Sequence, residues 1–209
     1  MPITRETRKI MEFVARESID RASLSLERLL HNGASIEAER VCFEDITIAT
    51  QRVNSSERKV VGAYLDLAGD VTFRLLFYVV EEDSLKLADL MLNRPLGTCA
   101  ATDALTLSAV QETGNILSGA IMGVFTKNFN LLMQPTPPQV VTDFEGTVFS
   151  EYLLSADIET DEVLIIECMI KLVECGVRCR MYLIPKTSCD TFLDYISDKR
   201  NTEDKCQKD

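Results

Sequence analysis

Residues 103–127, DALTLSAVQETGNILSGAIMGVFTK, form a long apolar stretch that is interrupted by polar side chains. Asp103, the first residue of this stretch, is a residue type that caps the N-terminus of a helix. Within the stretch, apolar residues recur at the spacing of one helix face, namely Leu107, Val110, Leu117, Ile121 and Val124. The pattern therefore predicts an amphipathic helix from about 103 to 127 that packs against a sheet through this face.

The polar residues of this helix fall on the opposite side. At about 100° per residue, Ser108, Glu112 and Asn115 lie within an arc of about 60°, and Gly119 continues the arc one turn later. The Lys and Glu pairs that usually fill exposed helix positions are missing here. Glycine costs helix stability but lets another backbone come close. We interpret this side as a docking surface, although periodicity alone favours an ordinary solvated face.

The rest of the sequence predicts two halves with the same order of elements: long helix, strand, hairpin, short helix. In the first half these elements are expected at about 4–31, 41–53, 59–80 with a turn at 68–70, and 84–92. In the second half they are expected at about 103–127, 129–149, 161–185 with a turn at 175–176, and 188–197.

This repetition predicts an internal duplication. The expected fold class is α/β, of the α+β kind, with pseudo-two-fold symmetry and long outer helices packed on one largely antiparallel sheet. Because no Pro/Gly/Ser-rich linker separates the halves, residues 1–200 are expected to form one domain, made of halves 1–95 and 96–200. Residues 201–209, NTEDKCQKD, are expected to be a polar tail.

Composition excludes several classes of function. The 209 residues carry a formal net charge of −11, which argues against a nucleic-acid partner because nothing would neutralise phosphates along a groove. No apolar run reaches the roughly 18 residues of a membrane-spanning helix, and no signal peptide is visible. A cytoplasmic protein is the expectation.

Cysteine and histidine usage gives no metal site. The seven cysteines are odd in number and lie in apolar or strand-like segments, which is typical of reduced thiols. Cys175 and Cys179 lie across a predicted turn and are the one pair whose spacing suits a disulfide or a metal. With His31 as the only histidine, nothing completes a zinc set. The chain is expected to bind no metal or cofactor of its own.

The polar side of the 103–127 helix also carries a sequence signature. Ser108, Glu112 and Asn115 are followed after 22 residues by Pro138. Ser-x₃-Glu-x₂-Asn-x₂₂-Pro resembles the signature of the CheC, CheX and FliY family of chemotaxis phosphatases. The surrounding QETGNILSG and TPPQVVTDF, the duplicated layout and the Pro185-Lys186 pair extend the resemblance over nearly the whole chain, and CheC-like proteins are the most similar.

Relatives of the CheC type carry this signature once per half, but the first half of this sequence departs from it. The best alignment puts Phe13 at the Asp/Ser position, keeps Glu17, places Asp20 where Asn belongs and puts Phe43 at the proline position. A carboxylate cannot donate a hydrogen bond as a carboxamide does, and it repels a phosphoryl group. The first site, with Glu17 and Asp20, is therefore expected to be degenerate.

The resemblance implies a phosphatase for the aspartyl phosphate of the response regulator CheY. The regulator would bring the phosphoaspartate, a Mg²⁺ and a lysine, so that positioning and electrostatics supply the acceleration. Asn115 would orient the attacking water, and Glu112 would pair with the regulator's lysine. Ser108 and Gly119 would support the docking surface, and Pro138 would shape a nearby loop.

The competing hypothesis is a binding module without useful catalysis, which docks a response regulator or a CheD-type deamidase. A half-degraded pair of sites fits that hypothesis, whereas an intact Glu112 and Asn115 favours the phosphatase. The identity of the regulator, the presence of CheD and the oligomeric state stay open, because edge strands can pair between chains.

Overall fold

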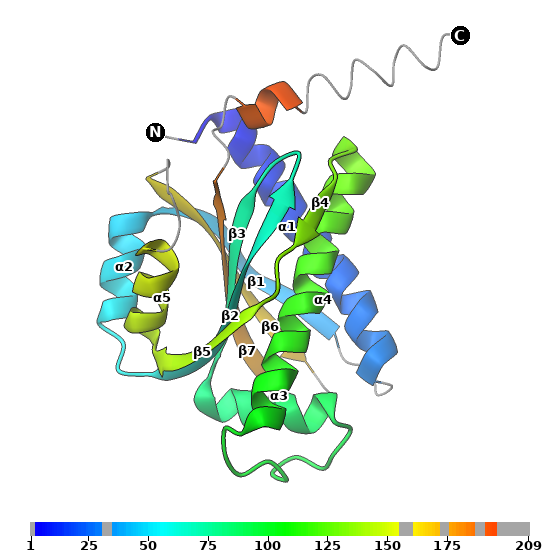
Figure 1. Ribbon diagram of the computed structural model, residues 1–209, viewed down its shortest axis with the longest axis vertical. Helices are drawn as coiled ribbons and strands as arrows, with labels where there is room; N and C mark the ends of the chain where they lie inside the picture. The colour runs from blue at the N-terminus through cyan, green and yellow to red at the C-terminus, as the bar shows by residue number, and fades with distance from the viewer. Residues whose placement is uncertain (1–2, 31–34, 155–160, 172–175, 187–190, 196–209) are drawn as a thin grey trace.

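The structure is a computed structural model that describes residues 3–30, 35–154, 161–171, 176–186 and 191–195 (Figure 1). The predicted polar tail, His31, Cys175 and half of the expected 188–197 helix lie outside the described residues, and the described part, 191–195, is helical. The elements of the first half are α1 (Arg5–Leu30), β1 (Ser35–Asp45), α2 (Ile46–Asn54), β2 (Lys59–Gly69), β3 (Phe73–Val80) and α3 (Glu81–Met91). Those of the second half are α4 (Ala104–Phe129), β4 (Met133–Pro135), β5 (Gln139–Phe144), α5 (Glu145–Leu154), β6 (Glu162–Lys171) and β7 (Gly176–Pro185).

All seven strands in the described part of the chain belong to one antiparallel sheet, as the sequence predicts. Its order is β1-β6-β7-β3-β2-β4, and β5 also pairs with β2. The hairpins β2–β3 and β6–β7 meet at the centre through β3 and β7. Each half places its outer strand beside the other half's hairpin, because β1 pairs with β6 while β4 and β5 pair with β2. The two halves therefore share one sheet.

Helices cover both faces of this sheet. The long helices α1 and α4 pack on one face, and α2 and α5 pack on the other (Figure 1). The larger apolar core lies under α1 and α4, and it includes Val110, Leu117, Ile121 and Val124 of α4. A smaller core lies under α2 and α5 around Phe149, Tyr152 and Tyr182. The predicted apolar face of the 103–127 helix is confirmed.

The segment 41–53, predicted as a strand, divides into a strand and a helix. β1 ends at Asp45, whose carboxylate accepts hydrogen bonds from the amides of Thr47 and Ile48 at 2.7 and 3.3 Å and so caps α2. The β-branched residues of 46–48 favour a strand locally. Burial of Ala49 and Val53 in the smaller core stabilises the helix instead.

The prediction of strands up to residue 149 is wrong in the same way, because α5 begins at Glu145. Its residues Val148, Phe149 and Tyr152 are buried against the sheet. Gly146 allows close contact with α2, since a Cβ built on it would lie 2.6 Å from Oδ1 of Asn54. The packing of α2 against α5 thus outweighs the local preference of these residues for a strand. Local sequence patterns do not reveal this packing, because the two helices are far apart in the sequence.

Equivalent helix boundaries in the two halves of the internal duplication are separated by a constant number of residues. Arg5 and Ala104 begin the long helices, Leu30 and Phe129 end them, and Ile46 and Glu145 begin α2 and α5, each pair 99 residues apart. The junctions match as well, since the amide of Ile46 donates to the carbonyl of Asp161 and that of Glu145 donates to the carbonyl of Arg58. This register allows the two long helices to be compared position by position.

Candidate functional site on α4

Helix α4 is held firmly at both ends. Asp103 caps its start by accepting hydrogen bonds from the amides of Leu105 and Thr106, both at 3.0 Å. It ends at Asn130, which adopts a left-handed conformation with φ of 50°. Between these ends the buried hydroxyl of Thr113 donates to the carbonyl of Ala109, so this polar group on the packed face is satisfied. A rigid helix of this kind can hold side chains in fixed positions for a partner.

The outward face of α4 carries four of the predicted site residues, and we refer to Ser108, Glu112, Asn115 and Gly119 as the α4 ridge. Ser108, Glu112 and Gly119 are exposed and Asn115 is half-buried. Nδ2 of Asn115 donates a hydrogen bond of 3.3 Å to Oε2 of Glu112. The carboxylate therefore orients the carboxamide, and Oδ1 of Asn115 can accept a hydrogen bond from a water molecule.

Ser108 and Gly119 flank this pair without adding reactive groups. The hydroxyl of Ser108 donates to the carbonyl of Ala104 at 2.8 Å, so it is engaged within its own helix. A Cβ built on Gly119 would meet nothing within 4 Å, which makes this position an open, low part of the ridge. Both observations fit a surface on which another molecule comes close to Asn115.

Gly119→Ala is expected to stabilise the protein by about 0.5–1 kcal/mol, because alanine favours a helix interior and its methyl group meets no neighbour. The free energy of unfolding in urea measures the effect. Gly123→Ala is the matched control, since its Cβ would lie 2.9 Å from Cζ of Arg21 and the gain should be smaller. A loss of stability in Gly119→Ala would show that the position is covered.

Pro138 is not part of α4. It sits between β4 and β5, which run along one sheet edge next to α4 (Figure 1). Residues 136–138 stand opposite only Leu65 and Asp66 of β2, so the edge strand bulges at this point. Pro138 also borders a cavity of about 390 Å³ with Tyr64, Asp66 and Arg74. Proline suits an edge bulge, where its missing N–H is not needed.

A residue that the sequence did not single out fixes the loop leading into α4. The buried carboxylate of Asp89, on α3, accepts hydrogen bonds from the amides of Gly97, Thr98 and Cys99 at 2.7, 3.0 and 2.8 Å. Burial raises the pKa of Asp89, but hydrogen bonds from the thiol and amide of Cys99 and from the other two amides outweigh it, so the pKa lies below its usual value. No local pattern marks Asp89, because the loop it binds comes later in the chain.

The loop is therefore expected to loosen in acid. Since the folded-state pKa of Asp89 is lowered, its contribution to stability is present above the unfolded-state pKa of about 3.9 and is lost as the pH falls through the folded-state value. Amide hydrogen exchange at Gly97, Thr98 and Cys99, corrected for the intrinsic effect of pH, should lose protection in this range. Asp89→Asn should show weak protection at every pH, and equal protection in the two proteins would contradict the assignment.

No family model matches this sequence. FliY from Thermotoga maritima superimposes with a TM-score of 0.74 at 16% identity, over 95% of this chain and 100% of that one. CheX from Desulfovibrio desulfuricans superimposes with a TM-score of 0.55 at 12% identity, over 83% of this chain and 99% of that one. FliM from H. pylori, in a complex with SpeE, superimposes with a TM-score of 0.66 at 10% identity, over 95% of this chain and 98% of that one. The chain has the fold of the CheC, CheX and FliY proteins. The resemblance seen in the sequence is thus confirmed at the level of the fold.

Within this CheC-like fold, the 99-residue register identifies the counterparts of the ridge on α1. Lys9, Phe13 and Arg16 occupy the places of Ser108, Glu112 and Asn115. The sequence alignment with Phe13, Glu17, Asp20 and Phe43 is shifted from this register by four residues, one helical turn. Both registers leave the first half without a carboxamide at the Asn115 position, which is the basis of the expectation that this site is degenerate.

The counterpart of Pro138 is also changed. The bulge in β1 leaves Glu39 unpaired between Ala38 and Arg40, 99 residues before Pro138. Phe43, which the alignment put at the proline position, lies further along β1, with the guanidinium carbon of Arg8 4.7 Å from its ring centroid. Glu17 is half-buried and Asp20 is exposed on α1.

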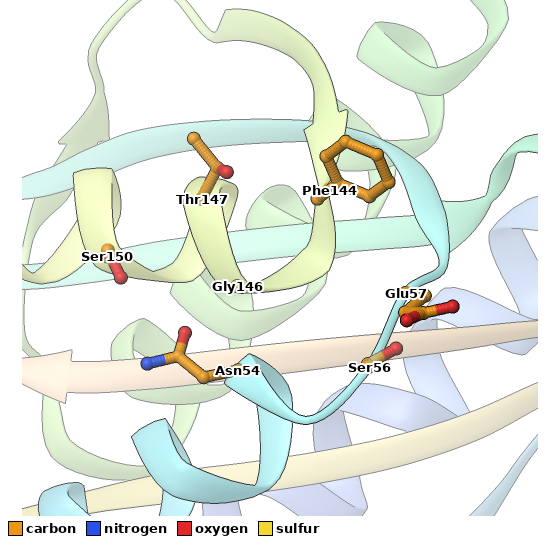
Figure 2. Close-up of a pocket in the computed structure, with 7 residues that line it drawn as sticks. All are labelled: Asn54, Ser56, Glu57, Phe144, Gly146, Thr147 and Ser150. Carbon is orange, nitrogen blue, oxygen red and sulfur yellow. The ribbon is translucent and has the colours of Figure 1, made fainter.

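The largest hollow by volume among those described lies away from α4. It measures about 540 Å³ and is open, between the end of α2 and the start of α5, with a lining of Asn54, Ser56, Glu57, Phe144, Gly146, Thr147 and Ser150 (Figure 2). Glu57 is its only ionisable residue, and none of the predicted site residues borders it. This hollow and the α4 ridge are therefore separate features of the CheC-like fold.

Within the described ranges, no group of three or more His, Cys, Asp or Glu residues is arranged to hold a metal ion. Cys42 and Cys99 are free thiols. Among the same residues no helix is both long and apolar enough to cross a membrane. The chemistry that the described α4 ridge offers is that of one carboxylate and one carboxamide.

Proposed function

We propose that this chain accelerates the hydrolysis of the aspartyl phosphate on a CheY-type response regulator in chemotaxis or a related two-component pathway. The observation that carries the proposal is the hydrogen-bonded pair of the exposed Glu112 and the half-buried Asn115 on the outward face of α4, at the spacing of the family signature. The CheC-like fold supports a role in chemotaxis signalling. A pathway of this kind places the activity in the cytoplasm.

In the proposed mechanism Asn115 enters the regulator's phosphorylation site. Its carboxamide accepts from, and donates to, the attacking water without adding negative charge beside the phosphoryl group. Glu112 holds Nδ2 of Asn115 at 3.3 Å in the free protein and, once docked, pairs with the regulator's lysine. The regulator's own Mg²⁺ neutralises phosphoryl charge when bound there. This chain contributes orientation and needs no nucleophile of its own.

The experiment that tests the proposal measures the decay of phosphorylated CheY-type regulators from the same genome. Each regulator is phosphorylated, and its decay is followed with and without this protein at one hundredth of its concentration. Faster decay with multiple turnovers supports a phosphatase. Decay at the intrinsic rate for every regulator would contradict it.

A binding module is the second candidate function. Two observations favour it: crystal structures of FliM with FliG and with SpeE share this fold, and α1 presents Phe13, 43% exposed, where α4 has Glu112. Such a module would dock a response regulator or a CheD-type deamidase. Binding of a phosphorylated regulator without faster decay would favour this candidate.

A further inference from the structure

Arg21, on α1, lies against the end of the α4 ridge although it belongs to the other half of the chain. Its Nη1 donates a hydrogen bond of 2.7 Å to the carbonyl oxygen of Gly123 on α4. Gly123 follows Asn115 and Gly119 at intervals of four residues, so the three positions lie along one side of the helix. The guanidinium therefore stands at the C-terminal end of the ridge.

Gly123 provides the space in which Arg21 is held. A Cβ built on Gly123 would lie 2.9 Å from Cζ and 3.0 Å from Nη2 of Arg21, too close for an unshifted guanidinium. A Cβ on Gly119 meets nothing within 4 Å. The surface between Asn115 and Arg21 is therefore open, whereas the surface over Gly123 is covered by the arginine.

The charge of Arg21 has no carboxylate partner among the residues that the structure describes. The side chain is exposed, and its one hydrogen bond goes to a neutral carbonyl group. A guanidinium has five N–H donors in a planar fork that fits a carboxylate. Four donors thus stay available on a side chain that is already oriented, which lowers the entropy lost on binding.

Arg21 is also near enough to take part in docking. Asn115 and Gly123 are separated along the helix axis by about 12 Å, eight residues at 1.5 Å each. A protein interface of ordinary size covers roughly 800 Å² on each partner. A circular patch of that area has a radius of about 16 Å, which exceeds the distance between the two positions. A protein docked over Asn115 would therefore also cover Arg21.

We propose that Arg21 is a positioning residue that binds a carboxylate of the docked response regulator, an inference that rests on the proposed phosphatase function. With a net charge of −11 on this chain, a cation at the interface also offsets repulsion of an acidic partner. Arg21 fixes where the regulator sits, and Asn115 acts on the water.

The test separates docking from chemistry. In the decay assay, Arg21→Ala should raise KM about tenfold and leave kcat unchanged, because the lost contact exists before and during the reaction. Arg21→Lys, which keeps the charge without the planar fork, should have a KM between those of the wild type and Arg21→Ala. Arg5→Ala, which removes an exposed arginine about 24 Å away on the same helix, is the control. The rise of KM with salt should be weaker in Arg21→Ala than in the wild type.

Gly123→Ala provides an independent variant, because it displaces the guanidinium without removing it. It should raise KM, and Arg21→Ala/Gly123→Ala should have the same KM as Arg21→Ala alone. If Arg21 only joined α1 to α4, the variants would lower stability towards urea and leave KM unchanged.

Binding of the regulator carrying beryllofluoride, measured by calorimetry, distinguishes this proposal from the function it rests on. If the wild type makes decay faster and Arg21→Ala has the same KM as the wild type, the proposed role of Arg21 is wrong and the phosphatase proposal is supported. If this protein does not make decay faster, the phosphatase proposal is wrong, and the Kd for the regulator then tests the role of Arg21. A larger Kd in Arg21→Ala than in the wild type supports a role of Arg21 in docking. An unchanged Kd, or no binding by the wild type, overturns it.

Discussion

Asn115→Ala should slow the accelerated decay of a phosphorylated regulator by about 10², which corresponds to the loss of one water-orienting contact of ~3 kcal/mol. Alanine has neither the oxygen that accepts from the water nor the N–H that donates. The fold should survive because the side chain is only half-buried and its hydrogen-bond partner is the exposed Glu112. Initial decay rates at saturating regulator measure the effect.

Two further variants sharpen this prediction. Asn115→Asp keeps the size of the side chain but places a negative charge beside the phosphoryl group, so it should be as slow as Asn115→Ala or slower. Asp20→Ala is the control on α1, and it should change the rate little because that site is expected to be degenerate. An unchanged rate in Asn115→Ala would remove Asn115 from the mechanism, and a large loss in Asp20→Ala would show that the first half still works.

Glu145→Ala should destabilise the fold by about 3 kcal/mol, because it removes a buried carboxylate that accepts hydrogen bonds from the half-buried Arg180 and from the buried Tyr78. Glu145 is 3% exposed, and Oε1 accepts hydrogen bonds from Nη1 of Arg180 at 2.7 Å and from the hydroxyl of Tyr78 at 2.5 Å. Arg180 also pairs with Glu167 at 2.9 Å, so the cluster joins α5 to the strands beneath it. The free energy of unfolding in urea measures the loss.

Comparison variants show whether the charge or the shape of Glu145 matters. Glu145→Gln keeps the shape and one acceptor, so it should cost less than Glu145→Ala. Glu57→Ala, an exposed carboxylate in the same layer, should change stability by no more than about 0.5 kcal/mol. Equal stability of Glu145→Ala and the wild type would mean that the buried cluster contributes no net energy.

Local sequence was sufficient for the elements that depend on neighbouring residues alone. The capped start at Asp103 follows from the residue type, and the buried face of α4 and the exposure of Glu112 follow from the 3.6-residue period. The hairpin around 68–70 follows from turn residues between two apolar runs. In each case the decisive residues are within a few positions of one another.

Other features depend on parts of the chain that are far apart in sequence. The helices α2 and α5 form where local preference favours strands, because each buries apolar residues against the other and against the sheet. The register between the halves differs by one helical turn from the best sequence alignment, because strand junctions and bulges set it.

The amino-acid sequence by itself determined the α4 ridge: which side of the helix is outward, and which carboxylate and carboxamide it carries. Only the tertiary structure decided what surrounds the ridge. The contact of Arg21 with Gly123 spans 102 positions, and Asp89 fixes a loop that comes after its own helix. Helical periodicity acts over a few residues, whereas these contacts exist only once the sheet has brought α1, α3 and α4 together.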